Sequence, residues 1–258
     1  LPALGLTIAR QLAECWERLG RPKPFEVREY GAGVGGLAYD LIAGLSREAP
    51  EAMDALRYRL IELNPYRRAE AQAAMEEVGL THLVIVEPPD AERPPLTGVM
   101  LANEVADAFP VHRLIVRQGE LRECYVTWSE SRFTEVEGPL SPEAARAAAA
   151  MSDEGILLSE GSRYDVSPAA ADWFAEVARS FARGYAIVID YGYPARELYR
   201  DHRLGGTVRA YHAHTVTDDP LNRVGEQDLT AHVDFTALQR AGEAAGLELA
   251  GFTTQGAF

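Results

Sequence analysis

The sequence has few cysteines, no excess of basic residues and no long apolar run, and each shortage argues against a class of protein. Its two cysteines, Cys15 and Cys124, form neither a metal-ligand spacing nor a disulfide framework, which favours a reducing compartment. The formal net charge is −14, whereas a nucleic-acid partner favours a basic surface. No apolar run approaches the roughly 20 residues of a membrane-spanning helix. We therefore expect no nucleic-acid partner and no membrane span.

What the chain does contain is an alternation of strand-like and helix-like segments over its first hundred residues. Short apolar runs over residues 25–30, 56–62, 82–86 and 98–102 read as strands, and helical apolar patterns separate the first three. Such β-α-β order predicts a parallel, doubly wound sheet, with ligands at the carboxyl ends of its strands. The 258 residues suffice for such a core with an additional lobe.

The pattern changes after residue 110. Two strand-like runs flank Gln118-Gly119, which is typical of a hairpin, and Ser141-Pro142 opens an alanine-rich helix. We expect residues 111–165 to form an inserted accessory lobe. Residues 1–110 and 166–258 would then form the core domain.

The last third of the chain mixes helical, strand-like and polar segments. We expect a helix after Ser167-Pro168, and a buried strand that ends in an acid. A polar stretch of this length without regular structure would be unusual in a compact domain, and such loops are often functional. The specific expectations are a helix stop at Gly184, a strand over 186–190, a structureless loop over 192–230, a capping box at 236–239 and a last strand over 247–252.

A glycine-rich turn follows the first predicted strand and leads into a helix. Gly31, Gly33 and Gly36 satisfy the dinucleotide pattern G-x-G-x-x-G, whereas Gly31, Gly33 and Gly35 satisfy the E-x-G-x-G-x-G pattern of S-adenosylmethionine (SAM) binding. Glu29 favours the second pattern, because a carboxylate at the end of a buried strand is costly unless a cation such as the methionyl ammonium pairs with it. A turn that binds no nucleotide and only begins a core helix is the third interpretation.

Acidic residues recur at the ends of the predicted strands. Four strands end in a carboxylate: Glu29, Glu62, Glu104 and Asp190. Glu62 follows the second strand, where an acid can accept hydrogen bonds from both ribose hydroxyls. Asn103, Glu104 and Asp107 crowd polar groups at the end of the fourth strand. The alternative for Glu62, Glu104 and Asp107 is that they carry charge at, or cap, the start of the next helix.

Five motifs in order carry a resemblance to a known family: EYGAGVGGLAYDL, LANEVADAFPVHR, VIDYGYP, GTVRAYHAH and GEQDLTAHVDF. Together they resemble the MidA/NDUFAF7-like family of SAM-dependent methyltransferases over nearly the whole chain. The resemblance implies an α/β protein with the class I SAM-methyltransferase fold, a Rossmann-like doubly wound sheet, here with the inserted lobe. It also implies SAM as cofactor and, because the mitochondrial member is a protein arginine methyltransferase, a protein substrate with a target arginine.

The resemblance also assigns roles to residues. Cofactor-binding roles fall to Glu29, Gly31, Gly33, Gly35, Glu62, Asn103 and Glu104. Catalytic roles fall to Asn103, Glu104, Asp107, His232 and Asp234. A pair of carboxylates such as Glu104 and Asp107 can grip a guanidinium in a fork. Arg28 departs from the family, which usually has an apolar strand residue there.

Other functions and properties stay open at this point. An NAD(P)-dependent Rossmann oxidoreductase and a noncatalytic SAM-binding assembly factor are the alternatives. We expect no metal, because His212 and His214 share a face of a strand-like run without a third ligand at suitable spacing. By resemblance the protein would be cytoplasmic if bacterial and mitochondrial if eukaryotic, and a homodimer is left open.

Overall fold

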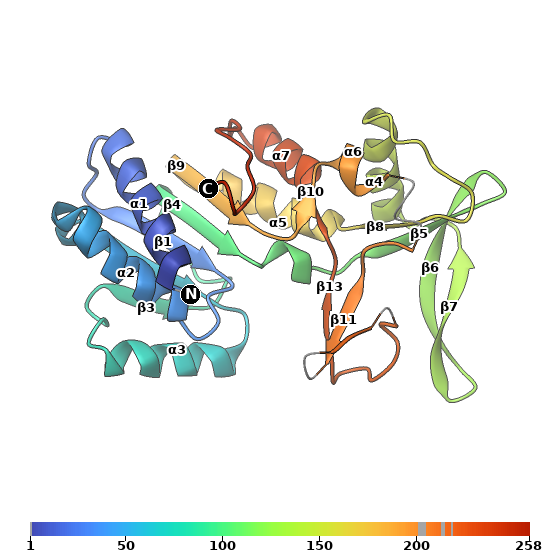
Figure 1. The fold of residues 1–258 in the computed structure, drawn as a ribbon, viewed down its shortest axis with the longest axis horizontal. Helices are drawn as coiled ribbons and strands as arrows, with labels where there is room; N and C mark the ends of the chain where they lie inside the picture. Colours follow the sequence, from blue (N-terminus) through green and yellow to red (C-terminus); the bar gives the residue numbers. More distant parts are fainter. Residues whose placement is uncertain (1, 201–204, 213–214, 218) are drawn as a thin grey trace. The chain divides into compact units, whose positions relative to one another are not determined.

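The computed structural model describes residues 2–200, 205–212, 215–217 and 219–258 (Figure 1). By its internal contacts the chain forms two compact units. The first consists of Leu1–Val105, Val177–Ile189 and Ala250–Phe258, and the second of Ala106–Glu176 and Asp190–Leu249. The predicted lobe over residues 111–165 falls within the second unit, and the predicted domain limits stay a prediction.

A parallel five-stranded sheet organises the first unit, in the order β3-β2-β1-β4-β9. Its strands are β1 (Phe25–Tyr30), β2 (Leu56–Ile61), β3 (Val84–Glu87), β4 (Leu96–Asn103) and β9 (Phe181–Ile189). From β1 the chain steps outward through β2 and β3, then crosses back so that β4 lies on the other side of β1. This confirms the predicted doubly wound sheet, whose order reverses between β1 and β4.

Helices cover one face of this sheet, and the hydrophobic core of the first unit lies between the helices and that face. They are α1 (Pro2–Arg18), α2 (Gly36–Glu48) and α3 (Pro65–Glu77), with the short 3₁₀ helix η1 (Pro50–Asp54) after α2. Leu12 of α1 and Leu41 of α2 are fully buried in one cluster with Val27 of β1. The start of α3 is as predicted, because the Asn64 side chain accepts hydrogen bonds from the backbone of the first turn and Pro65 occupies its first position.

The opposite face of the sheet carries a buried arginine. Strand alternation puts Arg28 on the face opposite to Val27, with 1% of its surface exposed. Its Nε lies 2.5 Å from Glu26 Oε1, and its Nη2 donates to the Pro94 carbonyl oxygen at 2.5 Å. A crossover between parallel strands is usually a helix, but residues 88–95 join β3 to β4 without one. Arg28 therefore holds this loop against the sheet, which explains its departure from the family pattern.

Further ion pairs continue from Arg28 across this face. Arg59 of β2 lies 3.1 Å from Glu26 and 3.0 Å from Glu87 of β3, and Glu87 also pairs with Arg93 of the crossover loop. All of these side chains are at most 17% exposed. Because each buried charge has an opposite charge beside it, the network avoids the full cost of desolvation.

The second unit contains the predicted hairpin in a four-stranded antiparallel sheet of order β7-β6-β5-β8. The strands are β5 (His112–Arg117), β6 (Glu120–Ser129), β7 (Arg132–Gly138) and β8 (Arg163–Val166); β6 and β7 form the long green hairpin in Figure 1. The sequence did not reveal β7, whose charged and apolar residues are mixed. Ser141 begins α4 (Pro142–Asp153) as predicted, since its hydroxyl accepts from the Ala144 N–H.

The remaining part of the second unit consists of short elements. They are η2 (Ala106–Ala108), β10 (Gly192–Tyr193), α6 (Ala195–Leu198), β11 (Arg209–His212), β12 (Thr215–Thr217), β13 (Asp228–Thr230), β14 (Val233–Asp234) and α7 (Phe235–Ala244). The expectation of a structureless loop over residues 192–230 is therefore wrong. The buried Asp165 of β8 anchors this region, because its Oδ2 accepts from the Thr207 and Val208 N–H groups. Such side chain to backbone bonds left no periodic signal in the sequence.

Three other expectations fail. The helix α5 (Pro168–Arg179) ends before Gly184, which lies inside β9, where a Cβ would come within 2.1 Å of the Gly98 carbonyl oxygen. This glycine serves close strand packing instead of a helix stop. Asp234, rather than a capping box at 236–239, caps α7. Residues 247–252 form no strand.

Two absences concern only the described residues. None of the helices there is both long and apolar enough to cross a membrane. No group of three or more His, Cys, Asp and Glu side chains among them is arranged to hold a metal ion. His212 lies in β11, where its Nδ1 is 2.6 Å from the Glu226 carbonyl oxygen, and His214 lies outside the described residues.

The contacts of Arg28 predict a stability effect. Arg28→Met removes the charge that compensates Glu26 and releases the crossover loop, so we expect a loss of about 3 kcal/mol in the free energy of unfolding. Arg57→Met, on the exposed surface of β2, is the matched control, for which we expect a change within about 0.5 kcal/mol. Urea denaturation measures both. Equal midpoints for the two variants would contradict the role given to Arg28.

Candidate functional site

The glycine turn after β1 has the backbone that its sequence predicts. Gly31, Gly33 and Gly35 have φ values of +65°, +55° and +82°, a region that favours glycine. A Cβ on Gly31 would come within 2.6 Å of a Val105 methyl group. At Gly33 the nearest group is the Arg67 guanidinium, 4.0 Å away. Packing thus excludes a side chain at Gly31, whereas Gly33 faces open space that a ligand could occupy.

The turn is fastened to the end of β2 through Glu62. Glu62 Oε2 accepts a hydrogen bond from the Gly33 N–H at 2.8 Å, and Oε1 accepts one from the Asn64 N–H at 2.8 Å. The Gly31 N–H donates to the Ile61 carbonyl oxygen at 2.8 Å. The structure therefore brings Glu62 and the glycine turn together, as the sequence predicts for a site at the carboxyl ends of β1 and β2.

Glu29 lies beneath the turn, buried on the face that α1 and α2 cover. Only 3% of its surface is exposed, and its register neighbours Leu60 and Leu101 are apolar. The Tyr58 hydroxyl donates to Glu29 Oε2 at 2.6 Å. Burial raises the pKa of Glu29 to about 7, although the hydrogen bond from Tyr58 lowers it. No Lys, Arg or His of the described chain forms an ion pair with this carboxylate, which therefore suits a cationic ligand.

Asn103 and Glu104 lie where the sheet order reverses. Asn103 is the last residue of β4, and Ala102 pairs with Tyr30 of β1, so both strands end at the same edge. Glu104 has a φ of +52°, uncommon for a residue with a side chain, and its N–H donates to the Ile189 carbonyl oxygen at 2.8 Å. Its carboxylate is exposed. Such backbone conformations cost roughly 1–3 kcal/mol and are concentrated at functional sites, which supports the predicted role of Glu104.

In the second unit, Asp107 and His232 belong to neighbouring segments. The Ala231 N–H donates to the Asp107 carbonyl oxygen at 3.0 Å, so the residue before His232 is held against η2. The His232 N–H donates to the Thr207 hydroxyl at 3.3 Å, and its ring lies 5.7 Å from that of Tyr193. Asp107 is buried. A backbone hydrogen bond thus keeps the segments that carry these two predicted site residues next to each other.

Asp190 and Asp234 have clear structural tasks. Asp190 Oδ2 accepts from the Ala106 and Asp107 N–H groups at 2.9 and 3.3 Å, which holds the start of η2. Asp234 Oδ1 accepts from the Thr236 and Ala237 N–H groups at 2.9 and 3.1 Å, which caps α7. Burial raises the pKa of Asp234, while these bonds and one from a tyrosine lower it. The contacts of Asp234 are those of a helix cap, and its catalytic role stays a prediction.

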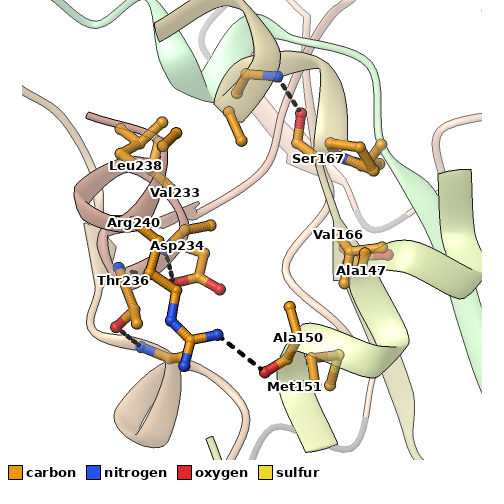
Figure 2. A pocket seen from close by; sticks show the side chains of 18 of the residues that line it. Ala147, Ala150, Met151, Val166, Ser167, Val233, Asp234, Thr236, Leu238 and Arg240 are labelled. Atoms are coloured by element: carbon orange, nitrogen blue, oxygen red, sulfur yellow. Dashed lines mark hydrogen bonds between the residues drawn. The ribbon is translucent and has the colours of Figure 1, made fainter. Parts of the chain in front are cut away.

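A cavity of about 290 Å³ lies within the second unit, between α4, α5, α7 and β8. Figure 2 shows Ala150 and Met151 on one side, Asp234 and Thr236 on the other, and the Arg240 guanidinium extending toward the Ala150 carbonyl oxygen. His232 also lines this cavity. Nothing in the sequence indicated this cavity, because the alanines of α4 read only as good helix formers.

An apolar surface beside Glu62 also escaped the sequence reasoning. Leu63 and Tyr66 are 78% and 81% exposed, although large apolar side chains usually avoid water. Leu63 directly follows Glu62, so a ligand held by that carboxylate would lie beside an apolar surface that suits a flat ring. In the sequence, this surface is marked only by Leu63, an apolar residue that directly follows the strand-end acid Glu62.

Comparisons with known proteins give a matching family and several similar proteins. The sequence model of a family described as "Putative S-adenosyl-L-methionine-dependent methyltransferase" matches residues 7–253. A Drosophila melanogaster protein named protein arginine methyltransferase NDUFAF7 homolog, mitochondrial, is 26% identical over 266 residues, covering 94% of this chain and 58% of its own length. The Mus musculus protein arginine methyltransferase NDUFAF7, mitochondrial, is 26% identical over 247 residues, covering 87% of this chain and 54% of its own length.

Two crystal structures of a Burkholderia thailandensis protein share the fold at 32% sequence identity. One, bound to S-adenosyl-homocysteine, has a TM-score of 0.84 and covers 95% of this chain and 61% of its own. The other, in its native form, has a TM-score of 0.85 and covers 98% of this chain and 66% of its own. The chain thus spans between 54% and 66% of the length of these relatives.

The burial of Glu29 predicts how stability changes with pH. Its pKa is about 7 in the folded protein and near 4.5 when solvated, so the folded state binds the proton more tightly and stability falls as pH rises from about 4.5 to about 7. Glu29→Gln removes this dependence. We expect the variant to match the wild type at pH 4.5 and to exceed it by about 3 kcal/mol at pH 8.5, at about 1.36 kcal/mol per pKa unit. Denaturation at the two pH values measures this. A wild-type advantage at pH 8.5 would contradict the burial of an unpaired carboxylate.

Proposed function

The chain belongs to the family of S-adenosyl-L-methionine-dependent methyltransferases whose model it matches, and from this membership we propose that it transfers methyl groups from SAM to arginine side chains of a protein substrate. The observation that carries the proposal is the glycine turn, with Glu62 hydrogen-bonded to Gly33 and the buried Glu29 beneath it. The relatives named protein arginine methyltransferase support the choice of arginine.

The residues at the turn fit SAM group by group. The Glu62 carboxylate can accept hydrogen bonds from two vicinal ribose hydroxyls, and the exposed Leu63 can cover one face of the adenine. Glu29 supplies the negative charge that the methionyl ammonium requires. The open space at Gly33 lets the ligand approach the backbone of the turn. When bound, SAM supplies a methyl group on a sulfonium sulfur, and Asn103 and Glu104 would border that end of the site.

An arginine acceptor requires orientation more than early deprotonation. Removal of its proton at pH 7 would cost about 7 kcal/mol, because its pKa exceeds about 12. Good alignment of donor and acceptor can instead supply roughly 7–11 kcal/mol. By resemblance to the family we assign Glu104 of the first unit and Asp107 of the second to the acceptor, since a carboxylate can orient a guanidinium through charge-assisted hydrogen bonds. His232 would accept the proton that leaves with or after methyl transfer, and Asp234 would hold the start of α7 near it.

The alternatives have no support. Neither the family nor the relatives point to an NAD(P)-dependent oxidoreductase or to a noncatalytic assembly factor. The relatives from fly and mouse are named mitochondrial. For a bacterial source we propose a cytoplasmic location, where the two free cysteines would stay reduced.

The direct test of the function uses labelled SAM. Lysate proteins are incubated with methyl-tritiated SAM, with and without the enzyme, and labelled proteins are digested for mass spectrometry. We expect enzyme-dependent methylarginine on a limited set of proteins. Labelling only of other residue types would contradict the arginine assignment, and no enzyme-dependent label would contradict transfer.

Substitution of Gly33 tests the cofactor site. Gly33→Val places a branched side chain in the open space of the turn, so we expect binding of S-adenosyl-homocysteine to disappear while the fold persists. Gly155→Val is the matched control, since Gly155 has a φ of +71° and no neighbour within 4 Å of its Cβ position, but lies after α4 in the second unit. Calorimetric titration and far-UV circular dichroism measure both. Unchanged affinity in Gly33→Val would remove the turn from the site.

Substitution of Asp107 tests the acceptor side. Asp107→Asn keeps the shape of the side chain but removes its charge, so the guanidinium loses a charge-assisted hydrogen bond and we expect kcat to fall by about tenfold or more, with little change in SAM affinity. Asp153→Asn, exposed at the end of α4, is the control. Methyl transfer rates and calorimetry separate the two effects. A wild-type kcat would exclude Asp107 from the reaction.

A further inference from the structure

Glu29 and Tyr58 form an isolated pair between the sheet and its helices. Tyr58 is 1% exposed and Glu29 3%, and the two residues lie on the same face of neighbouring strands. The Tyr58 hydroxyl hydrogen-bonds one carboxylate oxygen, Oε2, at 2.6 Å. In the described part of the chain no other side chain or backbone group donates to this carboxylate. The other oxygen, Oε1, receives no hydrogen bond from the described residues.

We propose that Tyr58 is a positioning residue for the cofactor, whose hydroxyl holds Oε2 of Glu29 so that Oε1 receives the ammonium group of SAM. This inference rests on the proposed function. It adds a residue outside the glycine motif, in the middle of β2, that no ligand needs to touch. It also makes cofactor binding depend on the protonation of Glu29, because a neutral carboxyl group gives an ammonium no charge to pair with.

The surroundings of Glu29 show which groups set this dependence. Its neighbours in register on β2 and β4 are Leu60 and Leu101, which do not titrate. Burial raises the pKa of Glu29 to about 7. Among the ionisable groups of the described chain only Tyr58 acts on this pKa as well, and its hydrogen bond lowers it. The ionisable residues Glu26 and Arg28 of β1 lie on the opposite face of the sheet.

Binding and proton release are then linked. Below pH 7 part of the free protein carries a proton on Glu29, and this proton passes to solvent when the ammonium of the ligand binds. Affinity should therefore rise with pH up to about 7, by up to about tenfold per pH unit below the midpoint. At higher pH the affinity falls again as the amine of the ligand loses its own proton. This alkaline limb of the pH profile reports the pKa of the ligand and not that of Glu29.

The test is a pH series of calorimetric titrations on the full chain. The first probe is S-adenosyl-homocysteine, and the second is 5′-methylthioadenosine, which has the adenosine and sulfur but neither the ammonium nor the carboxylate. For wild-type protein we expect the affinity for S-adenosyl-homocysteine to rise between pH 5.5 and 7.5. The affinity for methylthioadenosine should stay constant over that range.

Tyr58→Phe removes one hydroxyl and keeps the ring. We expect the acid limb for S-adenosyl-homocysteine to move up by about one pH unit, which is roughly tenfold weaker binding at pH 6. The alkaline limb and the affinity for methylthioadenosine should stay unchanged, which a general loss of structure would not allow. Tyr125→Phe is the matched control, because Tyr125 donates to Glu123 at 3.0 Å in the second unit.

Glu29→Gln provides a second variant in case Tyr58→Phe does not fold. Its binding of S-adenosyl-homocysteine should be weak, without an acid limb, and the addition of Tyr58→Phe should change it no further. Identical acid limbs in wild type and Tyr58→Phe would overturn the inference and leave the proposed function intact. Failure of both probes to bind wild-type protein would overturn the proposed function itself.

Discussion

The hydrogen bond from the Gly33 N–H to Glu62 is the contact on which the rest of the site depends. It joins the turn after β1 to the residue after β2, so that two strand ends become one surface. Left-handed glycines permit it, and the Gly31 N–H bond to Ile61 supports it. Because β4 adjoins β1 on the other side, Asn103 and Glu104 reach the same edge of the sheet. The parallel sheet therefore assembles the site from segments far apart in the sequence.

Buried charge marks both faces of the sheet, with different consequences. On the face opposite to α1 and α2, Arg28 compensates the charge of Glu26 and holds the loop that connects β3 to β4. On the helix-covered face, Glu29 has a hydroxyl but no cation beside it within the described residues. The first arrangement is balanced inside the protein and stabilises it. The second has no balancing charge among the described residues, and in the proposed function the ammonium of SAM would supply it.

The sequence predicted well whatever depends on local pattern. The parallel sheet, the glycine turn, the Asn64 and Ser141 caps and the β5–β6 hairpin followed from period and turn chemistry. It failed where a distant partner decides the structure. Gly184 reads as a helix stop until Gly98 is known to lie beside it, and Thr207 and Val208 read as part of an unanchored loop until Asp165 is seen to accept from their N–H groups. Tyr58 carries no signal at all, since its partner lies 29 residues away.

A crystal structure of the protein with S-adenosyl-homocysteine is the decisive experiment for the cofactor site. We expect the ligand ammonium within about 2.7–3.2 Å of Glu29 Oε1, with Tyr58 still on Oε2 and the ribose hydroxyls on Glu62. A ligand bound elsewhere, or one whose ammonium contacts other groups while Glu29 bonds only Tyr58, would contradict it.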